Sequence, residues 1–171
     1  MNIKKTANLL LNFAIKRLAE IFGAIISIVG VLLLISLISY SPDDPNFIFP
    51  ENTQIKNLLG FQGSFFSDLF FQSVGLIAYL VSFTFITTGI NILKTKEFFL
   101  IIENIFFTIL YCIFGTLFFD HFYSNIFPLY VNGNGGFVGN YLNQTFLNSI
   151  ILLNRDLFYY ILILFLSLIH I

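Results

Sequence analysis

The chain has 171 residues, of which 57% are hydrophobic and only 10% are charged, a balance far more apolar than that of a soluble globular domain. Its formal net charge of −1 excludes a basic surface that could hold a nucleic-acid backbone, and its single cysteine, Cys112, excludes an intrachain disulfide. The composition therefore predicts an all-α, polytopic membrane protein whose main partner is lipid, with no direct nucleic-acid contact in these residues.

The first predicted element is an uncharged run at about 21–39, "IFGAIISIVGVLLLISLIS". A helix of this length spans about 28 Å at ~1.5 Å per residue, which matches the hydrocarbon thickness of a bilayer. Residues 1–20, which contain two pairs of basic residues, are predicted to form a cytoplasmic N-terminal segment.

This run ends abruptly in "SYSPDDPNF" at 39–47. Pro42 and Pro45 are expected to stop the helix where water can satisfy the backbone hydrogen bonds. We expect Asp43 and Asp44 to sit in water, because a carboxylate costs about 3 kcal/mol in the bilayer interior. Their predicted role is in loop conformation or partner contact rather than catalysis.

Residues 46–73 mix polar and apolar side chains, and apolar residues recur at helical spacing in the second half, which predicts an interfacial helix. Two further spans are expected at about 74–93 and 98–119. Only the charged "KTKE" of 94–97 separates them, so these two helices must form an antiparallel hairpin.

The next segment contains the glycine-rich "NGNGGFVGN" at 132–140, predicted to be a flexible turn that launches a second interfacial helix at 141–153. A phosphate-binding loop is disfavoured because no Lys followed by Ser or Thr comes after it. A fourth helix at about 149–168 completes a predicted four-helix membrane domain at 21–165.

The last six residues, 166–171, read "LSLIHI", which is also one translation of a common transposase adapter used in sequencing. We hypothesise that this tail derives from the adapter, that His170 is not native and that a downstream cytoplasmic domain is missing. The alternative is a natural helix that happens to end in this way.

Charge predicts the orientation of the spans. Six of the eight basic residues precede the first span or lie in the hairpin turn, while Lys56 and Arg155 lie on the other side. Because basic residues are enriched in cytoplasmic loops, the N-terminus, the hairpin turn and, after four spans, the C-terminus are expected to be cytoplasmic.

Small residues recur at helical spacing in three of the predicted helices. Such stripes let helix backbones approach closely in lipid and predict a packed bundle or a homo-oligomer. The stripes are Gly23, Ser27 and Gly30, then Gly75, Ala78, Ser82 and Gly89, and finally Thr108, Cys112 and Gly115.

Few residues could carry chemistry. Glu103 is the only carboxylate well inside a span and is a candidate for an ion path. The favoured interpretation is a structural role, in which Glu103 reaches the interface or pairs with Lys94 or Lys96 near the helix end. Asp120 and His121 adjoin at the other end without a third ligand and are expected to be solvated. We therefore predict no catalytic, cofactor or metal site.

Four stretches, "RLAEIFG", "SYSPDDPNF", "NLLGFQGSFFSDLFFQSVG" and "GGFVGNYL", together resemble the N-terminal four-helix membrane domain of FtsK/SpoIIIE-type bacterial DNA translocases. In that family the first helix exits through Ser-Tyr-x-x-x-Asp-Pro, and Asn-x-x-Gly-x-x-Gly-x-x-x-x-Asp follows. The motif positions are Arg17, Glu20, Ser39, Tyr40, Asp44, Pro45, Asn57, Gly60, Gly63, Asp68, Gly75, Gly136 and Gly139.

The resemblance implies a domain that anchors an ATP-driven double-stranded DNA translocase in the inner membrane and targets it to the division septum, with division proteins as partners. These residues contain no Walker A sequence, so ATP and DNA would be bound by a motor outside them. Two alternatives stay open: a small transporter or channel subunit that uses Glu103, and a stand-alone membrane scaffold.

Overall fold

The computed structural model describes residues 3–45, 54–123, 132–147 and 155–169, and these parts are helical, with turns between the helices and no strand. The expected all-α fold class is confirmed. The elements are α1 (Ile3–Ile38), α2 (Gly60–Val74), the 3-10 turn η1 (Gly75–Ile77), α3 (Ala78–Thr95), α4 (Phe99–Tyr123), α5 (Gly136–Leu142), the π-helical turn η2 (Asn143–Leu147) and α7 (Arg155–Ile169).

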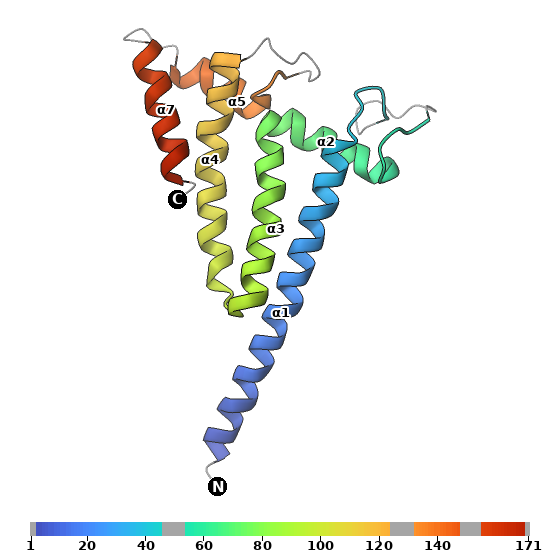
Figure 1. The fold of residues 1–171 in the computed structure, drawn as a ribbon, viewed down its shortest axis with the longest axis vertical. Coiled ribbons are helices and arrows are strands. Elements are labelled where there is room, and N and C mark those ends of the chain that lie inside the picture. Colours follow the sequence, from blue (N-terminus) through green and yellow to red (C-terminus); the bar gives the residue numbers. More distant parts are fainter. Residues whose placement is uncertain (1–2, 46–53, 124–131, 148–154, 170–171) are drawn as a thin grey trace.

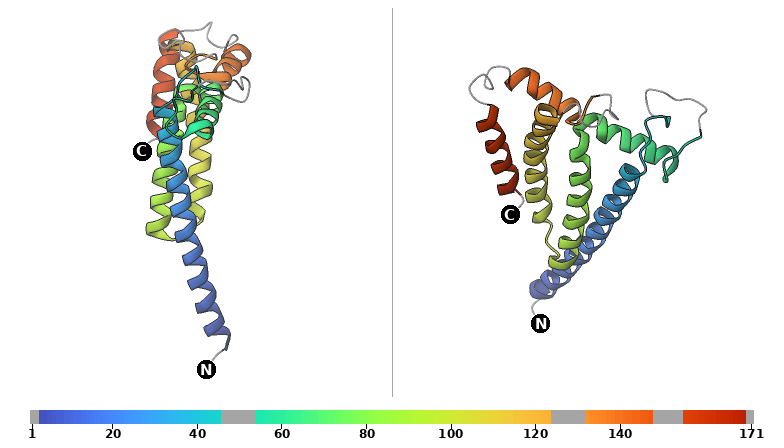
Figure 2. Two further views of the ribbon diagram at one scale, coloured as in Figure 1. Left: turned by 90° about the vertical axis from the view of Figure 1, so that its right-hand side faces the viewer. Right: turned by 45° about the horizontal axis from the view of Figure 1, so that its top comes forward.

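The three long helices α1, α3 and α4 form the body of the molecule (Figure 1). We call the end that carries the α3–α4 turn the hairpin end, and the opposite end, where α2 and α5 lie across the bundle, the loop end. Toward the loop end α1 and α3 splay apart (Figure 2), and α7 lies beside α4. The predicted hairpin of two long helices is thus present.

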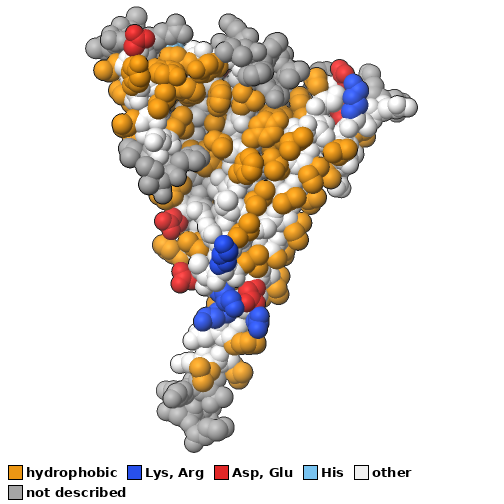
Figure 3. Space-filling model, in the orientation of Figure 1, with side chains coloured by type: hydrophobic (Ala, Val, Ile, Leu, Met, Phe, Trp, Pro, Cys, Tyr) orange, Lys and Arg blue, Asp and Glu red, His pale blue; other side chains and the backbone are white. Residues whose placement is uncertain are grey.

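The surface has the character expected of a protein surrounded by lipid. Three described stretches, at 7–38, 60–95 and 99–123, are long and apolar enough to cross a membrane, whereas the apolar part of α7, 156–167, is shorter. Large apolar side chains cover the visible face (Figure 3). Several buried side chains are instead small and polar, which is the reverse of a soluble core.

Helix α1 begins at Ile3, well before the predicted span, and its 36 residues make it about 54 Å long at ~1.5 Å per residue. It therefore runs past the hairpin end (Figure 1). Its other terminus, Ile38, is near the predicted one, just before Pro42. At the opposite end of the chain, α7 continues through Ile169 into the hypothesised tail, of which 170–171 lie outside the described residues.

Helices α1 and α3 pack closely because their small residues face each other. A Cβ added to Gly89 would lie 2.5 Å from the carbonyl oxygen of Gly23 and 2.3 Å from the hydroxyl of Ser27, and one added to Gly30 would lie 2.8 Å from the Ile86 nitrogen. Two of the predicted small-residue stripes therefore meet within one chain. Of the other residues in the predicted stripes, Gly75, Ala78, Ser82 and Gly115 are buried, whereas Thr108 and Cys112 are half-buried.

We expect Gly89→Ala to lower the free energy of unfolding by about 1–2 kcal/mol, because overpacking of ~1–3 kcal/mol exceeds the gain in helix propensity. Thr87→Ala, on the exposed side of the same helix, is the control and should change little. Unfolding can be followed in detergent through maleimide labelling of Cys112, the chain's single cysteine, which lies partly buried in α4. Equal stability of Gly89→Ala and the control would contradict this view of the contact.

Candidate functional site

The motif residues do not form a catalytic cleft; most of them gather in two polar junctions at the loop end. The exit junction joins the end of α1 to the start of α2 and contains Ser36, Ser39, Asp44, Asn57, Gly63, Ser64 and Ser67. The corner junction joins the α2–α3 bend to α5 and the end of α4 and contains Gly75, Thr116, Asn134, Gly136 and Gly139.

Asp44 organises the exit junction from a buried position. Only 4% of the residue is exposed, and its two carboxylate oxygens accept the backbone N–H groups of Lys56 and Asn57, both at 2.8 Å. The expectation that Asp44 sits in water is therefore wrong, because two charge-assisted hydrogen bonds compensate for its burial. These contacts favour loop conformation over partner contact as the role of Asp44.

Asp43 behaves as expected and is exposed. Its carboxylate accepts a hydrogen bond from the Lys56 ammonium at 2.8 Å, and this contact raises the pKa of Lys56. Two adjacent aspartates thus have different roles: Asp43 makes a surface ion pair, and Asp44 fixes the path of the chain.

Asn57 caps the end of α1 from a distance in sequence. Its side-chain amide donates to the carbonyl oxygens of Ser36 at 2.9 Å and Ser39 at 3.3 Å, while its Oδ1 accepts the N–H of Leu59 at 3.1 Å. The last carbonyl groups of a helix have no partner within the helix. Asn57 therefore satisfies the terminus of α1 and starts the turn into α2.

Gly63 lets α2 rest directly on this cap. A Cβ at Gly63 would lie 2.0 Å from Oδ1 of Asn57. The carbonyl oxygen of Gly63 accepts a hydrogen bond from the hydroxyl of Ser36 at 2.6 Å. The hydroxyl of Ser64 donates to the Pro45 carbonyl at 2.8 Å, and Tyr40 donates to Asp68 at 3.2 Å. The two family motifs, at 39–45 and 57–68, therefore form one hydrogen-bonded unit.

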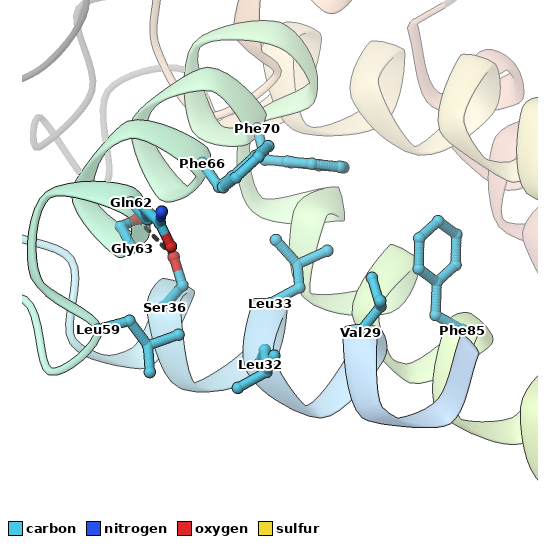
Figure 4. Close-up of a pocket in the computed structure, with 10 residues that line it drawn as sticks. All are labelled: Val29, Leu32, Leu33, Ser36, Leu59, Gln62, Gly63, Phe66, Phe70 and Phe85. Atoms are coloured by element: carbon cyan, nitrogen blue, oxygen red, sulfur yellow. Dashed lines mark hydrogen bonds between the residues drawn. The ribbon is translucent and has the colours of Figure 1, made fainter. Parts of the chain in front are cut away.

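An apolar groove of about 520 Å³ lies beside the exit junction, between α1, α2 and Phe85 of α3 (Figure 4). Phe66 and Phe70 project over it from α2, and the Ser36–Gly63 hydrogen bond lies at one end. Ser36 and Gln62 are the polar side chains in its lining, so the groove offers space for hydrocarbon rather than groups for catalysis.

The corner junction centres on Gly75, which has φ +59° and ψ −139° where α2 turns into α3. The backbone N–H of Leu76 donates to the carbonyl oxygen of Asn134 at 2.9 Å, and the fully buried Asn134 side chain donates to the Tyr123 carbonyl at 2.5 Å. A Cβ on Gly136, whose φ is +64°, would lie 2.6 Å from the Gly75 nitrogen. The bend is therefore built from backbones in direct contact.

The glycine-rich segment begins with a turn at 132–135, as predicted, but its last residues already belong to a helix. Helix α5 begins at Gly136, within the cluster, rather than at 141, and residues 148–153 of the expected helix lie outside the described residues. A Cβ on Gly139 would lie 2.5 Å from the Thr116 carbonyl oxygen. Gly135 and Gly139 allow close packing against α4, and Gly136 allows close packing against the α2–α3 bend, because a side chain at these positions would hold the segments apart.

The motif residues Arg17 and Glu20 lie instead at the hairpin end. Glu20 Oε2 pairs with Arg17 Nη1 at 2.5 Å, and Glu20 Oε1 pairs with Lys96 Nζ at 2.6 Å. Lys96 follows the last residue of α3 and caps this helix with φ +62°, and its N–H donates to the Ile92 carbonyl at 2.7 Å. Glu20 thus ties α1 to the hairpin turn.

The remaining candidates for chemistry do not assemble into a site. Glu103 lies exposed on α4, and Lys96 pairs with Glu20 instead of with Glu103. Asp120 is more enclosed than expected and accepts the side-chain amide of Asn143 at 2.7 Å, while His121 packs edge-on against Phe158. Among the described residues no three His, Cys, Asp or Glu side chains gather as a metal site would require.

Comparison with known proteins agrees with this architecture. The chain matches the family described as the 4TM region of DNA translocase FtsK/SpoIIIE over residues 15–170. Curated relatives named DNA translocase FtsK are 36% identical over 72 residues in Azospirillum brasilense, 31% over 78 residues in Rickettsia bellii and 32% over 73 residues in Caulobacter vibrioides. No solved structure shows a significant match.

These alignments cover 41%, 46% and 43% of this chain but 11%, 10% and 9% of the respective relatives, so the matched segment is about a tenth of each relative's length. The helical fold and the family match identify a helical membrane domain. The chain belongs to the FtsK/SpoIIIE 4TM family. The matched region is a membrane region and not the motor.

Proposed function

We propose that this domain anchors a DNA translocase in the bacterial inner membrane and targets it to the division septum, where the whole protein acts in chromosome segregation and cell division. The observation that carries the proposal is the family match over 15–170, within which the motif residues build both junctions. Membrane anchoring itself follows from the family and from the apolar helices. We assign the motor activity, and the binding of ATP and DNA, to the whole protein rather than to this domain.

We propose further that the hairpin end faces the cytoplasm and that copies of the domain associate with one another and with division proteins. The concentration of basic residues at 16–17 and 94–96 supports this orientation. The exposed apolar face of α4, which includes Ile102, Phe106 and Ile109, is a surface on which another membrane helix could pack.

The competing function, a small transporter or channel subunit, has less support. Such a protein would need Glu103 to face an internal aqueous path. Glu103 instead lies on the outer surface of α4. Polar side chains between α3 and α4 are hydrogen-bonded to each other, as Asn104 is to Thr88 at 2.9 Å.

Targeting can be tested by expressing the chain as a fluorescent fusion in dividing bacteria. We expect enrichment at the septum, and loss of that enrichment in Asn57→Ala, which removes the cap of α1. An even signal around the cell from a stable, inserted wild-type fusion would refute the targeting role while leaving the anchoring role intact.

Orientation needs a separate experiment in a Cys112→Ala background. A membrane-impermeant maleimide applied to spheroplasts, in which the inner membrane is intact and accessible, should label Lys56→Cys. It should label Lys94→Cys only after this membrane is opened. The reverse pattern would invert the proposed topology.

A further inference from the structure

Basic side chains gather at the hairpin end where α1 leaves the bundle (Figure 3). We define the basic patch as Lys16, Arg17, Lys94 and Lys96. With Glu20 and Glu97 included, four positive charges and two negative charges leave a formal net charge of +2. Because the whole chain carries −1, this end is positive while the rest of the chain is negative.

Two of these cations are held in fixed positions. Glu20 binds Arg17 at 2.5 Å and Lys96 at 2.6 Å, one with each carboxylate oxygen. Lys96 is also the one described non-glycine residue with positive φ, a conformation that a residue with a Cβ rarely adopts. A guanidinium has five N–H groups and an ammonium has three, so both cations have donors beyond those that Glu20 uses.

The surroundings of the patch identify the chemistry of its ligand. Ile21 and Phe22, which follow Glu20 directly on α1, are 57% and 51% exposed, and Phe22 contacts Phe98 beside the turn at 5.8 Å between ring centroids. An anionic group on the patch would thus have an apolar surface next to it. A phospholipid has both an anionic headgroup and apolar acyl chains, whereas inorganic phosphate has no apolar part that could contact this surface.

We propose that the basic patch binds the headgroup of an anionic phospholipid, with the lipid's acyl chains lying against Ile21 and Phe22. Glu20 is a positioning residue that holds Arg17 and Lys96 side by side. The site goes beyond anchoring and targeting, and it does not depend on which side of the membrane the hairpin end faces.

Native mass spectrometry of the 171-residue chain released from detergent micelles can measure the site directly. The probes are phosphatidylglycerol, phosphatidylcholine of the same acyl chains, and glycerol 3-phosphate as the soluble headgroup. We expect wild type to prefer phosphatidylglycerol, and each removed charge to reduce that preference by about fivefold. Glycerol 3-phosphate should not compete.

Lys16→Gln combined with Lys94→Gln is the main variant, because both side chains are exposed and the Glu20 contacts stay intact. Arg17→Gln with Lys96→Gln is the second, and Lys56→Gln at the loop end is the control. The proposal is overturned if the main variant keeps the wild-type preference, if wild type binds both lipids equally, or if Lys56→Gln weakens binding as much as the main variant. Competition by glycerol 3-phosphate would instead assign the patch to soluble phosphates and also overturn it.

Discussion

Gly75→Ala is expected to lower the free energy of unfolding by about 3–5 kcal/mol. Two costs add: a backbone conformation that is essentially restricted to glycine, ~1–3 kcal/mol, and steric overlap, ~1–3 kcal/mol. The overlap arises because the new Cβ would lie 1.9 Å from the carbonyl oxygen of Asn134, which already accepts the N–H of Leu76. The substitution should therefore detach α5 from the bend between α2 and α3.

Gly60→Ala separates the two costs. Gly60 also has positive φ, +65°, but a Cβ there would meet nothing within 4 Å. We expect this control to lose about 1 kcal/mol. Thermal unfolding in detergent, followed by maleimide labelling of Cys112, compares the two variants. If Gly60→Ala is as unstable as Gly75→Ala, backbone strain alone explains both results and the corner contact contributes nothing.

The sequence predicted those parts of the fold that depend on local chemistry. An uncharged run long enough for the bilayer, a four-residue charged turn and two prolines each constrain their own neighbourhood, and the corresponding helices and hairpin are present. The start of α1 was less predictable. Lys16 and Arg17 end an apolar run, but both are good helix formers, so charge marks a membrane boundary without ending the helix.

The junctions were harder to predict because each depends on contacts between distant segments. Asp44 was predicted to lie in water because burying an isolated carboxylate is costly. It is buried because it accepts hydrogen bonds from two backbone N–H groups, which belong to residues 56 and 57. Glycine is similarly ambiguous, since it provides either conformational freedom or the absence of a Cβ. For Gly139 the second property matters, and only the position of α4 reveals it.

Other junction residues gave a signal that the sequence interpretation did not use. Ser64 and Ser67 recur at helical spacing on α2, and both are buried, while Phe66 and Leu69 on the same helix are exposed. Small polar residues on one face of an otherwise apolar helix indicate a polar helix contact in lipid. Asn134 gave no comparable signal, because its role depends on the backbone of Gly75.

Asp44→Asn is the second substitution from which we expect a large loss, about 2–4 kcal/mol of unfolding free energy, because charge-assisted hydrogen bonds and buried unsatisfied groups are each worth ~1–3 kcal/mol. The amide has nearly the same shape as the carboxylate but only one oxygen. Its NH₂ group would face the backbone N–H of Lys56 or Asn57, so one buried donor would lose its acceptor. The loop from Ser41 to Pro45 should then detach from the start of α2.

Asp43→Asn makes the same chemical change one residue earlier and provides the matched control. Its side chain is 74% exposed and loses only a surface ion pair with Lys56, a contact worth ~0–1 kcal/mol. We expect Asp43→Asn to unfold near the wild-type temperature and Asp44→Asn clearly below it, with the Cys112 thiol labelled earlier on heating. Because the Asp44 contacts join α1 to α2, Asp44→Asn should also increase proteolysis between residues 45 and 56. Equal behaviour of the two variants would mean that the Asp44 contacts do not hold the exit junction together.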